Sequence, residues 1–173
     1  MRLFKNIFFS NKFKHFTIIA FLLFVFVMVN AWSYVSAVSS NISNNVFRLH
    51  VIANSDSDED QSLKYIVRDA VIDYVRSSTS SATCKEELIQ MLDLYKIKDV
   101  AYNTVLANGY SYPVSVELGN FEFPTKTYGD ISLPSGFYDA LRVKIGSASG
   151  KNWWCVMFPP LCFVDVSSRY CSR

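Results

Sequence analysis

The chain has 173 residues, the length of one domain with a short extension. Half of its residues are hydrophobic and 16% are aromatic, which excludes a disordered chain, because such chains are poor in aromatic residues and rich in net charge. The net charge of +2 is too small for a protein that binds nucleic acid through a strongly basic surface.

The charge is unevenly distributed along the chain. The first fifteen residues carry four basic side chains and no acidic one, and the first acidic residue is Asp56. Without these four of the 17 basic residues, 13 remain against 15 acidic ones, which leaves a net charge of −2. The averages therefore combine a basic leader with a slightly acidic domain.

The leader has the composition of an export signal. Residues 16–29 read FTIIAFLLFVFVMV, and a basic segment before a short apolar one is typical of a secretory signal peptide, with Ala37 at a suitable cleavage site. An uncleaved anchor also fits, because a spanning helix needs roughly 20 apolar residues and Trp32 and Tyr34 suit a membrane interface. Either way the basic end stays inside, so we expect residues 1–37 to export the rest of the chain across the cytoplasmic membrane.

Four cysteines follow the leader, and disulfides persist outside the cytoplasm. Cys155 and Cys162 flank a Pro-Pro corner that could fold the chain back between them, so we expect these two to pair. Cys84 and Cys171 would then form a second pair, and four reduced cysteines are the alternative. No zinc site is expected, since there is no CxxC motif and the exported part has a single histidine. We expect no metal and no other cofactor.

A polar segment, residues 38–45, predicts a linker before one exported domain, residues 46–173. Residues 47–53 alternate between apolar and other side chains, which predicts a strand with one apolar face. Ser57 and Asp60 match a helix-capping pattern, and they precede an apolar stripe of helical period from Leu63 to Val75.

Two further helices are expected before the sequence changes period. The second runs over residues 85–95 with Tyr95 facing inward, and after a break at 96–98 the third restarts at Asp99 and ends at Asn108-Gly109.

Beyond Gly109 the period is two, which is typical of strands. Residues 114–118 and 121–123 predict two strands joined by a hairpin turn at Gly119-Asn120, and residues 141–145 and 152–158 predict two more. The predicted fold class is α+β, with a mainly antiparallel sheet of about four to five strands and two to three helices on one face.

Catalytic patterns are weak in this sequence. Asp56, Asp58 and Asp60 resemble the start of a calcium-binding loop, but the glycine and glutamate that the loop requires are missing. His50 lies close in sequence to Ser55, yet no nucleophile elbow or glycine-rich oxyanion loop accompanies them. We expect no enzyme activity, no catalytic residues, and a structural role for His50.

The features that suit a protein contact lie in the C-terminal half. Lys126, Tyr128 and Asp130 belong to a long irregular link between strands. Trp153 and Trp154 are adjacent in a strand, so they point to opposite faces of the sheet, and one of them needs a cover from the chain or from a partner. These five residues are the candidate partner contacts.

The exported domain resembles the stage II sporulation protein R family over roughly residues 46–166. The resemblance rests on separate blocks in the same order: FRLHVIANSDSDEDQSLKY (47–65), VRDA (67–70), YPVSVELG (112–119), FPTKTYGDI (123–131), ALRVKIG (140–146) and KNWWCVMFPPLCFVDV (151–166).

The resemblance implies an exported signalling protein of endospore formation, which acts between forespore and mother cell. It implies that the protein activates a membrane-bound aspartic protease of the mother cell, which then processes the sigma-E precursor. An exported hydrolase acting on peptide or cell wall and a structural or adhesive septal protein are the alternatives.

Overall fold

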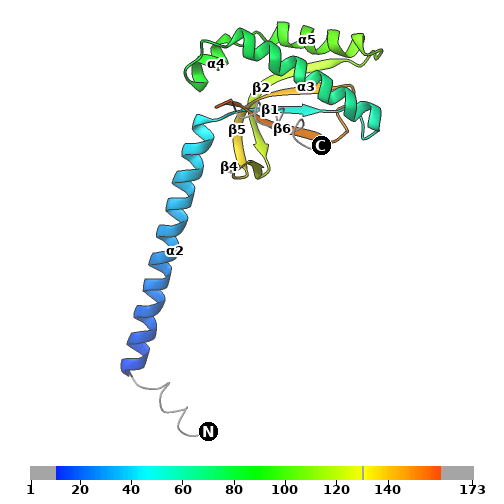
Figure 1. The fold of residues 1–173 in the computed structure, drawn as a ribbon. Coiled ribbons are helices and arrows are strands. Elements are labelled where there is room, and N and C mark those ends of the chain that lie inside the picture. The colour runs from blue at the N-terminus through cyan, green and yellow to red at the C-terminus, as the bar shows by residue number, and fades with distance from the viewer. Residues whose placement is uncertain (1–10, 130, 161–173) are drawn as a thin grey trace. The chain divides into compact units, whose positions relative to one another are not determined.

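The computed structural model describes residues 11–129 and 131–160, which fall into two units that divide after Ser40. In chain order the described elements are α2 (Asn11–Asn45), β1 (Phe47–Ile52), α3 (Asp58–Ser78), α4 (Lys85–Met91), α5 (Leu94–Ala107), β2 (Val114–Phe123), β3 (Lys126–Tyr128), β4 (Ile131–Leu133), β5 (Gly136–Ile145) and β6 (Asn152–Phe158) (Figure 1).

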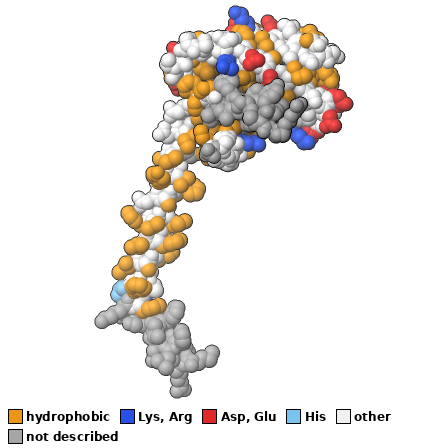
Figure 2. All heavy atoms as spheres, viewed as in Figure 1, with side chains coloured by type: hydrophobic (Ala, Val, Ile, Leu, Met, Phe, Trp, Pro, Cys, Tyr) orange, Lys and Arg blue, Asp and Glu red, His pale blue; other side chains and the backbone are white. Residues whose placement is uncertain are grey.

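The apolar leader forms one continuous helix, α2, of 35 residues. Residues 13–45 are long and apolar enough to cross a membrane, and hydrophobic side chains gather along the helix (Figure 2). A signal sequence has the same properties, so both interpretations of the leader remain open. The helix continues through the predicted linker to Asn45, so residues 38–45 are helical and not irregular.

The second unit is built around a four-stranded mixed sheet in the order β2-β5-β1-β6. Strand β1 is parallel to β5 and antiparallel to β6, while β2 is antiparallel to β5. The predicted α+β class is confirmed. Strands β5 and β6 follow one another in the chain but do not pair, because β1 lies between them.

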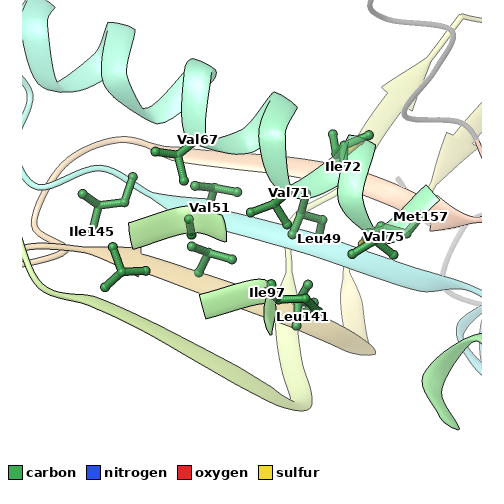
Figure 3. Packing of buried hydrophobic residues seen from close by; sticks show 14 of the residues in the cluster. Leu49, Val51, Val67, Val71, Ile72, Val75, Ile97, Leu141, Ile145 and Met157 are labelled. Atoms are coloured by element: carbon green, nitrogen blue, oxygen red, sulfur yellow. The ribbon is translucent and has the colours of Figure 1, made fainter. Parts of the chain in front are cut away.

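Helices α3 and α5 lie over one face of this sheet (Figure 1) and bury its main core. On α3 the buried apolar residues recur at helical spacing, and they meet Leu49 and Val51 of β1, Ile97 of α5 and Leu141 of β5 (Figure 3). Each such side chain contributes roughly 1.5–3 kcal/mol when it is fully buried, so this core is the main source of stability.

Helix α3 begins where the capping pattern places it. The Ser57 hydroxyl accepts a hydrogen bond from the backbone N–H of Asp60, at 3.2 Å. The Asp60 carboxylate does not return to Ser57, because it accepts bonds from Asn54 at 2.8 Å and from Ser55 at 2.6 Å. Asp60 therefore ties the end of β1 to the start of the helix.

The break between the second and third helices lies earlier than predicted. Helix α4 ends at Met91, and Asp93 caps α5 by accepting bonds from the backbone N–H groups of Tyr95 and Lys96. Tyr95 is 85% exposed, so its predicted inward orientation was wrong. The local cap at Asp93 outweighs the apolar spacing on which that prediction rested.

Strand β2 runs unbroken through the predicted hairpin turn at Gly119-Asn120. Gly119 pairs with Ala140 and Asn120 with Asp139, in a register that extends over all ten residues of β2. The chain reverses later, where the predicted irregular link contains the two short strands β3 and β4, paired as a separate two-stranded sheet.

The second face of the main sheet carries a smaller apolar cluster. Phe123, Tyr138 and Val156 of the sheet are buried there, together with Leu133 of β4. Tyr128 of β3 packs against the same cluster. The β3–β4 hairpin therefore covers part of the sheet face that the helices leave free.

Candidate partner-binding surface

The adjacent tryptophans lie on opposite faces of the sheet, and each is half-buried. Trp153 packs on the helix side, where its ring meets Tyr65 edge-on at 5.4 Å and the Arg68 guanidinium lies 4.4 Å from its centre. Trp154 lies on the second face and stacks on His50, with ring centres 3.7 Å apart. The chain itself therefore covers a part of both rings.

The β3–β4 hairpin brings two of the predicted contact residues together. The Tyr128 hydroxyl accepts a hydrogen bond from Arg48 at 2.9 Å and donates one to the Trp154 carbonyl at 3.2 Å. Lys126 is exposed on the same hairpin, whereas Trp153 lies on the other face of the sheet. Asp130 lies outside the described residues. Tyr128 thus anchors the hairpin, and Lys126 is the exposed member of this set.

A row of polar and aromatic side chains crosses the second face next to the hairpin. In register across the sheet, Glu117 of β2 pairs with Arg142 of β5, Arg142 with His50 of β1, and His50 with Trp154 of β6. We call these four residues, together with Lys144, the cross-sheet row. Its charged members are partly exposed.

The charges of the cross-sheet row hold one another in place. Glu117 accepts hydrogen bonds from Arg142 at 2.7 Å and from Lys144 at 2.6 Å. The hydrogen bond from Lys144, and to a smaller extent the one from Arg142, lowers the pKa of Glu117 below its usual value. The Arg142 guanidinium also lies 3.8 Å from the centre of the Phe121 ring. The result is a hydrogen-bonded patch with two basic groups and one acidic group.

His50 is a buried, neutral member of the row. Its Nε2 atom is 2.9 Å from the side-chain oxygen of Asn152. The pKa of His50 is lowered from 6.5 to about 4, mainly by burial and also by the charges of Arg142 and Lys144, although the hydrogen bond to Asn152 opposes this. Ser55 donates its hydroxyl proton to Asp60, so the two residues considered for a hydrolase are engaged in separate hydrogen bonds.

Glu117, Arg142 and Lys144 are not among the contact residues predicted from the sequence. Arg142 and Lys144 are the polar positions of the alternating block ALRVKIG, so their shared face could be predicted. Their meeting with Glu117 depends on the pairing of β2 with β5, which the predicted hairpin at Gly119-Asn120 had concealed.

The cysteines are only partly described. Cys155 is buried in β6 and is disulfide-bonded. Cys162 lies outside the described residues, so the pairing of these two stays a prediction. Cys84 is free and exposed, so the expected second pair with Cys171 was wrong. Within residues 11–129 and 131–160, no group of three or more His, Cys, Asp or Glu side chains could hold a metal ion.

Comparisons with known proteins agree on one family. Residues 43–168 match the family described as Stage II sporulation protein R. Stage II sporulation protein R of Bacillus subtilis (strain 168) is 41% identical over 129 residues, which cover 73% of this chain and 58% of the relative. The match therefore spans little more than half of that relative's length. No solved structure matches this chain. The chain belongs to the stage II sporulation protein R family.

Proposed function

We propose that this chain is an exported signalling protein of endospore formation. It acts in the space between forespore and mother cell, and it activates a membrane-bound aspartic protease that processes the sigma-E precursor. It does so by binding and performs no catalysis of its own. The observation that carries the proposal is the family match over residues 43–168, which begins in the last residues of an apolar helix suited to export.

The geometry of the second sheet face supports a role in binding. The cross-sheet row is partly exposed and combines arginine with aromatic rings, and these residue types are enriched in protein interfaces. Lys126 projects from the neighbouring hairpin and is exposed. Exposed charges at the rim of such a surface act mainly on the rate of association.

The test is co-expression of the full chain with the protease and the sigma-E precursor, with precursor cleavage as the measurement. Lys126 is the cleanest position for a variant, because Tyr128 and Trp154 also hold the hairpin to the sheet. We expect Lys126→Ala to slow cleavage several-fold without changing the unfolding temperature.

Lys98→Ala is the matched control, since Lys98 is an exposed lysine on α5 at the helix side. We expect it to leave cleavage unchanged. Equal cleavage by both lysine variants would remove Lys126 from the contact surface. Absence of cleavage with the unaltered chain would refute the proposed function itself.

A further inference from the structure

Arg48 is a fully buried arginine without an acidic partner in the described part of the chain. It lies in β1 on the second sheet face and is 0% exposed. Its guanidinium lies between two aromatic rings, 4.1 Å from the centre of Phe123 and 4.8 Å from that of Tyr138. Its one hydrogen bond there is from Nη2 to the Tyr128 hydroxyl, while Nε and Nη1 have no partner.

Such an arrangement is costly for the fold. A buried charge is ordinarily paired with an opposite charge, because their attraction offsets the free-energy cost of removing the charge from water. The faces of Phe123 and Tyr138 offset only a part of that cost. An apolar side chain of similar length would fill the same space without this desolvation cost. The guanidinium is therefore not explained by stability alone.

A second unpartnered polar group lies next to Arg48. His50 follows on the same face of β1 and is 6% exposed, and its Nδ1 atom is buried without a hydrogen-bond partner in the described residues. Because Nε2 is bonded to the Asn152 side-chain oxygen, it carries the proton, and Nδ1 is an acceptor. Two donor nitrogens of Arg48 and one acceptor nitrogen of His50 thus have no hydrogen-bond partner among the described residues.

The cover over Arg48 is small. Strands β3 and β4 have three residues each and are not part of the four-stranded sheet. Two-stranded hairpins of this size have little stability of their own, so this hairpin opens more readily than the helix-covered core. In this structure the Arg48 guanidinium donates its hydrogen bond to the Tyr128 hydroxyl. A neutral hydroxyl is a weaker hydrogen-bond acceptor for a guanidinium than a carboxylate is.

We propose that Arg48 binds a carboxylate at a site beneath the β3–β4 hairpin, and that the protein partner carries this carboxylate. The assignment of the carboxylate to a partner rests on the proposed function. In the bound state the carboxylate replaces the Tyr128 hydroxyl and accepts two N–H groups of the planar guanidinium, a geometry that arginine favours.

The first experiment measures thermal unfolding of the full chain in detergent, with acetate as the carboxylate probe in place of chloride at constant ionic strength. Acetate should raise the unfolding temperature of the unaltered chain and leave that of Arg48→Met unchanged. Arg142→Met is the matched control, and it should keep the acetate response, because Arg142 is already bonded to Glu117. Equal responses of the unaltered chain and Arg48→Met, including no response in either, overturn the site.

Arg48→Met should also unfold at the same temperature as the unaltered chain or at a higher one, since it removes an unpaired buried charge. Tyr128→Phe supplies an independent test if Arg48→Met does not fold. It removes the hydroxyl that competes for Arg48, so the acetate response should appear at lower acetate concentration. An unchanged or weaker response in Tyr128→Phe overturns the proposal.

A variant at Asp130 separates an external carboxylate from one of the chain itself. If the acetate response appears only after Asp130→Asn, the chain supplies its own carboxylate to Arg48 and the proposal is overturned. A response in the unaltered chain that Asp130→Asn does not change supports an external ligand.

The second experiment is the cleavage assay with the co-expressed protease and sigma-E precursor. Arg48→Met should reduce cleavage at least tenfold without a lower unfolding temperature. Cleavage at the level of the unaltered chain would overturn the role of a partner carboxylate. If the unaltered chain supports no cleavage, the proposed function fails, while the acetate measurement still decides whether Arg48 binds carboxylates.

Discussion

Arg48 and His50 occupy the alternate positions of β1 that a half-exposed strand would give to water, yet both are buried. The alternation in the sequence correctly separates them from Phe47, Leu49 and Val51, which face the helices. It does not reveal that Trp154 and the β3–β4 hairpin cover the second face. At the scale of single residues, the burial of these two polar side chains follows from their position beneath Trp154 and the β3–β4 hairpin.

The depressed pKa of His50 predicts a dependence of stability on pH. The unfolded chain binds a proton near pH 6.5, and the folded chain binds it only near pH 4, so stability falls as the pH drops between these values. The loss amounts to at most about 3 kcal/mol at pH 4. Chemical denaturation at several pH values measures this slope.

His50→Gln removes the titrating group, so its stability should fall less than that of the unaltered chain between pH 6.5 and pH 4. The comparison cancels the contributions of Glu117 and Asp139, whose own pKa values are depressed by their hydrogen bonds. Parallel pH profiles of the two proteins would contradict the buried, neutral state of His50.

At the scale of elements, helix α5 begins at a cap that was not among the features predicted from the sequence. Asp93 accepts two backbone N–H groups, each at 3.1 Å. Asp93→Ala should therefore lower the free energy of unfolding by about 1 kcal/mol, as loss of an N-cap typically does. Asp99→Ala removes a similar charge from within the same helix without removing a cap, and its effect should be below about 0.5 kcal/mol. Equal effects in denaturant unfolding would disprove the capping role.

Helix α3 and strand β2 show why some elements could be predicted and others not. The stripe on α3 repeats over more than three turns, and the cap at Ser57 reinforces it, so local signals agree. In β2 the Gly119-Asn120 pair is a local turn signal, but ladder pairing with all ten residues of β5 outweighs it. The Phe121 ring lies over Gly119. It fills the space that a side chain at position 119 would otherwise occupy.

At the scale of the whole molecule, the chain combines an apolar leader helix with a separate compact unit. In the leader, the side chains from Phe16 to Val38 are exposed, as a membrane segment or signal sequence requires. Leu23→Arg should therefore reduce the amount of chain in the membrane and exported fractions, because a central arginine costs about 2.5 to 3.5 kcal/mol on insertion.

Asn41→Arg is the control for that variant, since it adds the same charge at the polar end of α2. It should leave fractionation unchanged. Equal distribution of Leu23→Arg and the unaltered chain between soluble and membrane fractions would show that the apolar run does not direct export.

The apolar leader, the α+β class, the start of α3 and the family could be predicted from the sequence, because each rests on local periodicity, composition or ordered blocks of residues. The tertiary structure alone decided that β1 lies between β5 and β6, that Glu117 meets Arg142 and Lys144, and that Tyr128 closes over Arg48. These contacts join residues that are far apart in the sequence. Glu117 and Arg142 are 25 positions apart, and His50 and its partner Asn152 are 102 positions apart. Pairing between distant strands and the burial that follows from it are properties of the assembled sheet, and no single segment encodes them.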